Sequence, residues 1–182
     1  MANRRTAQLT EAMKTRCLMR FNSQFEECNV CGYVMDIGPQ FFILAVVSDH
    51  IRFDGFECFR VCDVRNLRPE PYASFVETAL RKRNENFPRK PNLSLENISQ
   101  LLLTASQNFP LVTIHRERID PEICQIGRVV GVKRGSVSLL EILPGAVWEE
   151  TPENYRLRDI TRISFGADYE NALYLVGNDP QG

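Results

Sequence analysis

Two stretches of this chain carry the same order of apolar and polar positions. Residues 32–47 read GYVMDIGPQFFILAVV and residues 127–142 read GRVVGVKRGSVSLLEI, so that Gly32 falls on Gly127 at an offset of 95. In each stretch an apolar run leads to a turn rich in Gly, Pro or charged residues, and a second apolar run follows. This is the pattern of two adjacent β-strands joined by a tight turn. We therefore expect one such strand pair in each half of the chain.

The correspondence continues beyond these strand pairs. After one inserted residue, residues 59–64 (FRVCDV) fall on residues 155–160 (YRLRDI), and after a second insertion Tyr72 falls on Tyr169. Any two β segments can alternate alike by chance, but the shared Arg-x-x-Asp ending and the following Tyr favour an internal repeat. In both copies the Asp is expected to accept backbone hydrogens and hold the turn before the last strand, rather than to contact a ligand.

Helical spacing at both ends of each copy completes the pattern. Before the second strand pair, a helix is predicted by the spacing of Leu95, Ile98, Leu101, Leu102 and Ala105, with Asn92 or Ser94 as its cap and Pro110 beyond its end. A weaker counterpart precedes the first strand pair at Leu9, Ala12 and Met13, and short helices close the copies near residues 75–80 and 169–176.

The sequence thus predicts a mainly β protein with short helices. We expect a first helix-plus-barrel repeat over residues 1–80, a linker over 81–93 and a second repeat over 94–178. Each short sheet is expected to bend into a barrel, because bending buries one face and removes the edges.

A helix followed by about five bent strands resembles the Sm-like and SH3-like small barrels. The second copy is also similar to a group of uncharacterised bacterial proteins, in the runs IHRE at 114–117, CQIGRV at 124–129, Trp148 and YRLRDIT at 155–161. This resemblance covers roughly residues 111–176. It implies two tandem five-stranded barrels related by internal duplication, and it implies no activity. The RNA-contacting pattern of true Sm proteins, Asp-x-x-x-Asn followed late in the chain by Arg-Gly, is not evident here.

The charge balance limits the classes of partner. Lys and Arg number 22 and Asp and Glu number 23, for a formal net charge of -1, which argues against a protein that coats nucleic acid by charge alone. Residues 71–110 are mildly basic and residues 111–182 mildly acidic. No apolar run approaches the roughly 18–20 residues of a spanning helix, and the first residues lack the apolar core of a secretion signal. We therefore expect a cytoplasmic protein without a membrane partner.

One basic cluster lies in the expected linker. It consists of Arg81, Lys82, Arg83, Arg89 and Lys90, with Phe87 among them. Such a segment could bind phosphates while Phe87 stacks on a base, which makes it a candidate nucleic-acid site. The alternative is an ordinary solvated linker.

The cysteines raise the question of a metal. Cys28-x-x-Cys31 and Cys58-x-x-x-Cys62 could supply the four thiolates of a structural zinc site. The pairs are separated by 26 residues, which is not a familiar zinc spacing, and the second copy keeps only Cys124. Reduced thiols without any cofactor are therefore the expected state, with zinc as the alternative and a redox pair less favoured still.

The sequence contains no catalytic constellation that would indicate an enzyme. There are two histidines, His50 and His115, and no nucleophile elbow, phosphate-binding loop or dinucleotide fingerprint. We expect a non-enzymatic binding or scaffold protein that acts through strand edges on a peptide, on another protein or on a second copy of itself. An RNA-associated protein that uses the basic segment is the alternative, and an enzyme with a site between the repeats is a third possibility.

Overall fold

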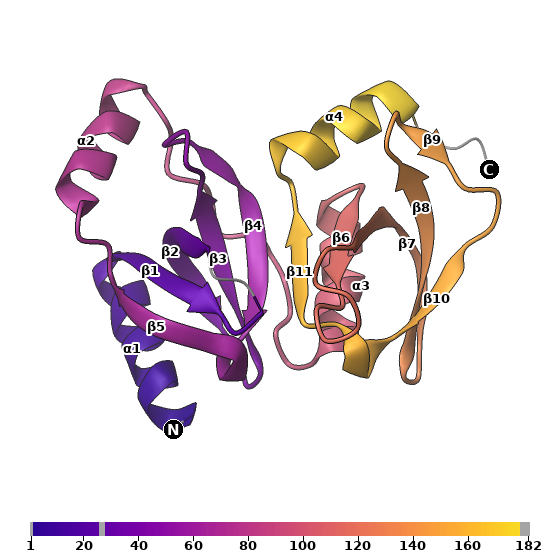
Figure 1. Cartoon of the computed structure of the whole chain (residues 1–182), viewed down its shortest axis with the longest axis horizontal. Coiled ribbons are helices and arrows are strands. Elements are labelled where there is room, and N and C mark those ends of the chain that lie inside the picture. Colours follow the sequence, from indigo (N-terminus) through magenta and orange to yellow (C-terminus); the bar gives the residue numbers. More distant parts are fainter. Residues whose placement is uncertain (1, 26–27, 179–182) are drawn as a thin grey trace. The chain divides into compact units, whose positions relative to one another are not determined.

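A computed structural model describes residues 2–25 and 28–178 of the chain. The chain divides into two compact units, Met1–Lys90 and Pro91–Gly182, and the division falls inside the segment expected to be a linker. Both units consist mainly of antiparallel strands with short helices, so the expectation of a mainly β protein is confirmed (Figure 1). No helix among the described residues is long and apolar enough to cross a membrane.

The first unit is one antiparallel sheet with a helix at each end of the chain segment. Its strands lie in the order β4-β3-β2-β1-β5. Along the chain its elements are α1 (Ala2–Thr15), β1 (Leu18–Ser23), β2 (Asn29–Ile37), β3 (Phe41–Val47), β4 (Phe53–Arg60), the 3-10 turn η1 (Val61–Asp63), β5 (Val64–Pro69) and α2 (Ala73–Lys82).

The second unit has the same kind of sheet, in the order β10-β8-β7-β6-β11, with the short β9 also paired to β8. Along the chain its elements are α3 (Ile98–Asn108), β6 (Val112–His115), β7 (Cys124–Lys133), β8 (Ser136–Leu143), β9 (Val147–Trp148), β10 (Glu153–Arg156), the 3-10 turn η2 (Leu157–Asp159), β11 (Arg162–Phe165) and α4 (Asp168–Gly177). In both units the last strand therefore pairs with the first.

The two units also agree in local detail at residues that the expected repeat places in matching positions. Gly32 and Gly127 both sit where the neighbouring strand is so close that an added Cβ would lie 2.3 Å from the Ala45 oxygen or 2.2 Å from the Leu140 oxygen. The ladder register then shifts between Val34 and Asp36 in the first unit and between Val129 and Gly131 in the second, which are matching positions. The turns η1 and η2 also fall on matching residues.

The prediction that each sheet closes into a barrel is wrong. Among the described residues no ladder joins β4 to β5, nor β10 to β11. Consecutive strands pair when a hairpin turn folds the chain back on itself, whereas η1 and η2 carry the chain from one end of the sheet to the other. Both sheets therefore remain open between their last two strands.

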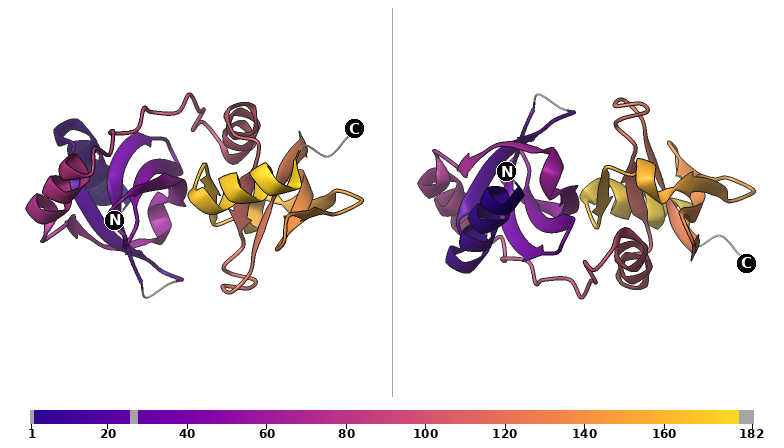
Figure 2. Two further views of the ribbon diagram at one scale, coloured as in Figure 1. Left: turned by 90° about the horizontal axis from the view of Figure 1, so that it is seen from above. Right: turned by 90° about the horizontal axis from the view of Figure 1, so that it is seen from below.

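Each unit buries its own core. In the first, α1 lies along β2 (Figures 1 and 2) and contributes Leu9 to the core. Phe21 meets Phe42 and Phe59, with ring centroids 5.7 Å and 5.0 Å apart. In the second, α3 lies along β7 with Leu101 and Leu102 completely buried.

The cap of α3 differs from the prediction. Asn97, rather than Asn92 or Ser94, accepts a hydrogen bond from the Gln100 backbone N–H at 3.0 Å. Leu95 is buried but precedes the helix. The spacing of its apolar side chain therefore predicts a helix that starts before the observed one.

Candidate functional site

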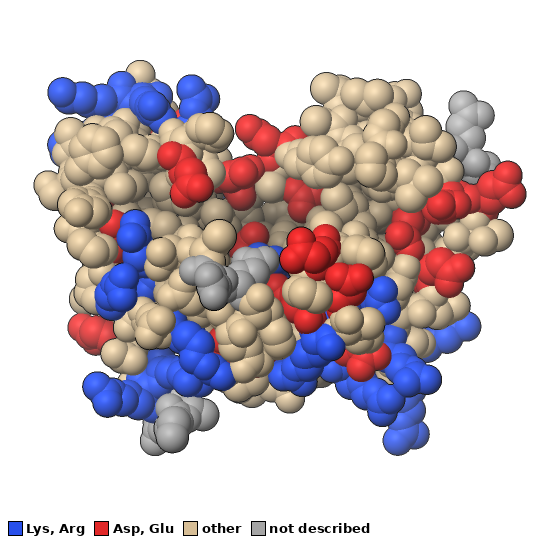
Figure 3. Space-filling view, in the orientation of Figure 1, with Lys and Arg blue, Asp and Glu red and all other residues tan. Residues whose placement is uncertain are grey.

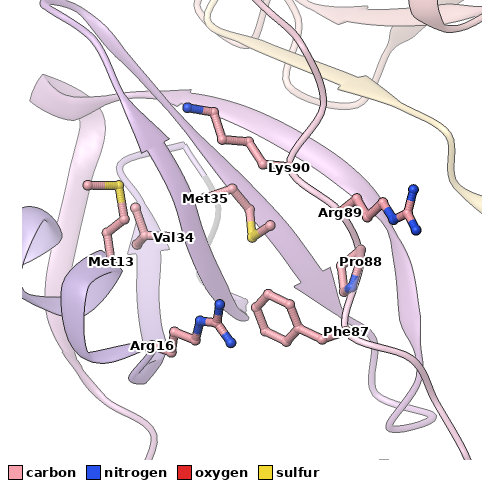
Figure 4. A pocket seen from close by; sticks show the side chains of 8 residues that line it. All are labelled: Met13, Arg16, Val34, Met35, Phe87, Pro88, Arg89 and Lys90. Carbon is pink, nitrogen blue, oxygen red and sulfur yellow. The ribbon is translucent and has the colours of Figure 1, made fainter.

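A groove of about 480 Å³ opens on the first unit beside Phe87. Its walls come from three segments that are distant in sequence: the end of α1, the middle of β2 and the chain that follows α2. They supply Met13, Arg16, Val34, Met35, Phe87, Pro88, Arg89 and Lys90 (Figure 4). We call this the Phe87 groove. Its walls are mostly apolar, and its charged side chains are all cationic.

Phe87 is anchored to the unit by other rings. Its centroid lies 5.1 Å from that of Tyr33 and 5.7 Å from that of Phe53, both in edge-to-face geometry. The Arg16 guanidinium lies over the Phe87 ring, 5.5 Å from its centroid, and the two groups face each other across the groove in Figure 4. Phe87 thus tethers residues 83–90 to the sheet, and a cation already covers one face of its ring.

Two of the five predicted basic side chains hold this segment in place. Arg83 donates to the backbone oxygens of His50 and Ile51, the latter at 3.1 Å. Lys90 forms an ion pair with Asp36, with 2.6 Å between Nζ and Oδ2. The segment expected to be a solvated linker is therefore packed on the first unit.

The other three basic side chains are free to meet a ligand. The side chains of Arg81, Lys82 and Arg89 make no hydrogen bond or ion pair with any residue that the structure describes, and Arg89 is directed outward at the groove rim (Figure 4). Arg81 lines a second cavity of about 390 Å³, which also holds Glu77 and Glu85.

The fold therefore brings only part of the predicted nucleic-acid-binding cluster into one groove. Phe87, Arg89 and Lys90 share one groove, Arg81 lies in the neighbouring cavity, and Lys82 and Arg83 line neither. Sequence reasoning did not assign Arg16 or Met35 to the site. No local signal could have found them, because they meet Phe87 only once residues 87–90 have folded across β2.

The structure does not bring the four cysteines together in the way that the zinc alternative requires. Among the described residues no group of three or more His, Cys, Asp and Glu side chains is placed to hold a metal ion. Cys28 and Cys62 are exposed. Burial raises the pKa of Cys58, while burial and the nearby Glu70 carboxylate raise the pKa of Cys31 to about 12. Both shifts disfavour the thiolate form that a zinc ligand takes.

A polar cluster in the second unit bears on the enzyme hypothesis. Its centre is His115 on β6, whose Nδ1 lies 3.2 Å from an Arg162 guanidinium nitrogen and whose Nε2 lies 3.3 Å from Ser164 Oγ. The guanidinium nitrogen of Arg162 also forms an ion pair with Glu117 at 3.1 Å. Burial and the Arg162 charge lower the pKa of His115 to about 3.

The proton positions in this cluster follow from donor chemistry. Arg162 can only donate, so Nδ1 of His115 is the acceptor and the ring proton is on Nε2, where it donates to Ser164. A histidine that activates a serine must instead accept the hydroxyl proton. The His115–Ser164 pair therefore has the opposite arrangement, and the cluster ties β6 to β11.

The chain matches no family model, no curated protein and no solved structure. Its function is accordingly argued from the geometry of the Phe87 groove and of the charged surfaces around it.

Proposed function

We propose that the chain consists of two tandem, open, five-stranded units of the Sm-like and SH3-like kind, related by internal duplication. The shared strand order supports this proposal. So do the close approach at Gly32 and Gly127, the matching register shifts that follow them, and the turns η1 and η2. The division of one end strand into β9 and β10 is the main difference between the units. Membership of the bacterial group named above belongs to the same proposal.

We further propose that the protein is a non-enzymatic, cytoplasmic binding and scaffold protein, and that the Phe87 groove receives an acidic segment of another protein chain. The apolar walls carry two methionines, Met13 and Met35, whose flexible side chains adapt to different shapes. Arg16 and Arg89 supply uncompensated positive charge beside these walls. A segment with a small apolar side chain between carboxylates would satisfy both features.

Two features favour a protein segment over a nucleobase in this groove. The Phe87 ring already packs against Tyr33 and Phe53 and carries Arg16 over one face, so it is not a free stacking platform. Stacking of a base on that face would require the displacement of Arg16. A peptide needs only the apolar walls and the cationic rim.

The segment that best fits this description is on the chain itself. Residues 149–153 read EETPE, and all five are exposed. The first four connect β9 to β10, and Glu153 is the first residue of β10. The side chains of Glu149, Glu150 and Glu153 have no hydrogen-bond or ion-pair partner among the residues that the structure describes. Figure 3 shows acidic side chains gathered where Figure 1 draws this connection.

Such a contact would join the groove of one copy to the acidic loop of the next. A head-to-tail contact of this kind builds rings or open chains, which suits a scaffold. Strand addition at β5 is less suitable, because its free edge carries Arg65, Arg68 and Pro69, and charges and proline oppose edge pairing. The groove rather than that edge is therefore the proposed contact.

The observation that carries this proposal is the apolar groove with Arg16 and Arg89 at its rim, and complementary charge reversal tests it. We expect wild-type protein to associate reversibly in sedimentation velocity and to dissociate as salt is raised. A groove variant (Arg16→Glu with Arg89→Glu) and a loop variant (Glu149→Lys with Glu150→Lys) should each be monomeric. An equimolar mixture of the two should associate again, because each intact surface finds its intact partner.

Matched controls separate this contact from a general effect of charge. Lys82→Glu and Glu122→Lys reverse exposed charges outside the groove and the loop, and should leave association unchanged. A wild-type chain that stays monomeric at about 100 μM, a concentration that populates even weak specific complexes, would count against self-association. So would a mixture of the two variants that remains monomeric.

RNA association through the basic segment is the second candidate function. Its support is that the side chains of Arg81, Lys82 and Arg89 pair with no residue in the described ranges 2–25 and 28–178. If it holds, a single-stranded RNA should bind in a filter assay at about 50 mM salt and lose most of its affinity by about 200 mM. Arg81→Glu with Lys82→Glu should weaken that binding. Absence of binding at low salt, or affinity that ignores salt, would reject it.

A further inference from the structure

A third cavity in the first unit, distinct from the Phe87 groove and from the cavity beside Arg81, has a different chemical character. It encloses about 270 Å³ between α1 and β5, and it shares no residue with the Phe87 groove. Three of its lining side chains are guanidinium groups, those of Arg4, Arg5 and Arg65, and two more are the amides of Gln8 and Asn66. None of its lining residues is acidic.

Two of these guanidinium groups are held next to each other. Arg5 donates to the backbone oxygen of Cys62 at 3.0 Å, and Arg65 donates to the same oxygen at 2.8 Å. Arg65 is fixed further by the Val64 oxygen at 3.0 Å and by the Gln24 side chain at 2.6 Å. The folded chain thus places two like charges side by side in a defined geometry.

No carboxylate of a residue that the structure describes forms an ion pair with the guanidinium groups of Arg5 and Arg65. The acid nearest in sequence, Asp63, is buried, and its Oδ1 accepts a hydrogen bond from Gln24 Nε2 at 2.5 Å. Two adjacent cations without a counter-ion repel each other, and a bound anion would remove that repulsion.

The donors that remain suit an oxyanion. A guanidinium carries five N–H donors, of which Arg5 uses one and Arg65 three in the contacts above. The β1–β5 ladder also shifts between Arg20 and Asn22, leaving Asn66 and Leu67 in a bulge at the cavity. Figure 3 shows Lys and Arg gathered over the part of the first unit where Figure 1 draws α1 and β5.

We propose that this cavity is a binding site for a phosphate group, with Arg5 and Arg65 as its principal ligands and Arg4 as an additional cation at its mouth. Guanidinium groups match the tetrahedral oxyanion through paired N–H donors, and a dianion can neutralise both charges. The ligand chemistry is a terminal phosphate group, which inorganic phosphate and the phosphate monoester of a larger molecule both present.

The test measures binding of inorganic phosphate to the full chain. In a two-dimensional NMR titration at constant ionic strength, phosphate should shift the Arg5 and Arg65 side-chain resonances in a saturable manner, and chloride should not. Affinity should rise as phosphate gains its second charge, near pH 6–7. Phosphoserine should bind comparably if monoesters are accepted, and a phosphodiester such as single-stranded RNA should bind more weakly because it carries one charge per phosphate.

Variants identify the residues responsible. Arg5→Gln should weaken phosphate binding at least tenfold, and Arg5→Lys should retain part of the wild-type affinity. Arg68→Gln is the control, because Arg68 is an exposed arginine of β5 outside the cavity. Its phosphate affinity should stay within about twofold of wild type. Arg5→Gln binding phosphate as well as wild type overturns the proposal. Chloride producing the same shifts, or no saturation by about 10 mM phosphate, also overturns it. Arg5→Lys keeps the test decisive if Arg5→Gln does not fold.

Discussion

Gly32 and Gly127 are the residues at which the backbone of a neighbouring strand leaves no room for a side chain. An added Cβ would lie 2.3 Å and 2.2 Å from backbone oxygens, distances at which the strand itself must move. Gly131 on the same strand as Gly127 has nothing within 4 Å of its added Cβ, which makes it a matched control. Glycine is therefore required at two equivalent positions for steric reasons.

We expect Gly32→Ala and Gly127→Ala each to lower the free energy of unfolding by about 2 kcal/mol, because overpacking against backbone cannot relax through a side-chain rotation. Gly131→Ala should change it by less than about 0.5 kcal/mol, as for most open surface sites. Urea denaturation of the three variants measures these differences. Equal effects at Gly127 and Gly131 would contradict the close approach of β7 and β8.

His115 makes the stability of the second unit depend on pH. Its pKa is about 3 in the folded chain against 6.5 for the free side chain, because burial and Arg162 disfavour the imidazolium. Between pH 6.5 and pH 3 the unfolded chain binds a proton that the folded chain does not, so the free energy of unfolding falls as pH falls through this window. Above pH 6.5 the contribution is constant.

The loss across this window should be a few kcal/mol, on the order expected from a shift of several pKa units. Urea midpoints measured from pH 7 to pH 4 should show a steeper decline in wild type than in His115→Gln. His50→Gln, which changes an exposed turn residue, should keep the wild-type slope. Parallel slopes in wild type and His115→Gln would show that folding does not lower the pKa of His115.

At the scale of elements, α3 shows how a helix start is chosen. Asn97 has an extended backbone and its side chain accepts from the Gln100 N–H, whereas the sequence also offered Asn92 and Ser94. The Asn92 backbone oxygen accepts from the Asn108 side chain, so Asn92 joins the end of the helix and does not cap its start. When several possible capping residues lie close together in the sequence, the packing of the preceding segment decides which of them caps the helix.

Asn97→Ala should lower the free energy of unfolding by about 1 kcal/mol, the usual cost of a lost N-cap. Asn92→Ala removes a side chain of the same type from the same segment and should have little effect, because only its backbone oxygen is used. Chemical denaturation of both variants provides the comparison. The reverse order of effects would place the cap at Asn92.

The helices that close the two units, α2 and α4, bury only part of their predicted apolar faces. Helical spacing predicted α2 and α4 correctly, but Phe75 and Tyr169 on the predicted apolar faces are 64% and 56% exposed. Leu80 and Leu173 are the residues that are buried. A helical period identifies residues that share a face, but it contains no information on how much of that face another element covers.

At the scale of the whole molecule, each unit has its own buried core and should fold by itself. Residues 83–90 belong to the first unit, because Phe87 packs on Tyr33 and Phe53 and Lys90 pairs with Asp36. We expect fragments 1–90 and 91–182 each to unfold cooperatively. A fragment of residues 1–80 should be less stable than 1–90 by about 2 kcal/mol, the sum of two aromatic contacts.

This difference corresponds to a decrease of roughly 10 °C in Tm for a unit of this size. Calorimetry of the two first-unit fragments measures it, and Phe87→Ala in fragment 1–90 should account for most of the loss. Phe75→Ala, which removes an exposed ring of α2, is the matched control. Equal Tm values for fragments 1–80 and 1–90 would show that the segment after α2 contributes nothing to the first unit.

Much of the fold could be predicted because it depends on local order along the chain. The alternation around Gly32 and Gly127, the turns at Asp63 and Asp159, and the helical spacing before and after each sheet are all visible in the sequence. The prediction that the sheet closes was wrong, because whether the last two strands of a unit pair with each other depends on how η1 and η2 direct the chain in space.

The candidate sites show where sequence reasoning stops. The basic segment with Phe87 was visible, but it was treated as one linear cluster of six side chains. The folded chain uses Arg83 and Lys90 to attach the segment to the first unit. Arg16, Met13 of α1 and Met35 of β2 line the groove together with Phe87, Arg89 and Lys90. Arg5 and Arg65 both donate to the backbone oxygen of Cys62. No local sequence pattern predicts this, because the two arginines are 60 positions apart.

By itself, the sequence determined that the chain is mainly β, that its halves share one pattern, and where most helices and strands lie, because hydrophobic periodicity and turn residues act over a few neighbouring positions. Only the tertiary structure decided that the sheets stay open, that Phe87 meets Arg16, and that Arg5 lies beside Arg65. These outcomes depend on contacts between distant segments, and such contacts form only after the local elements have packed together.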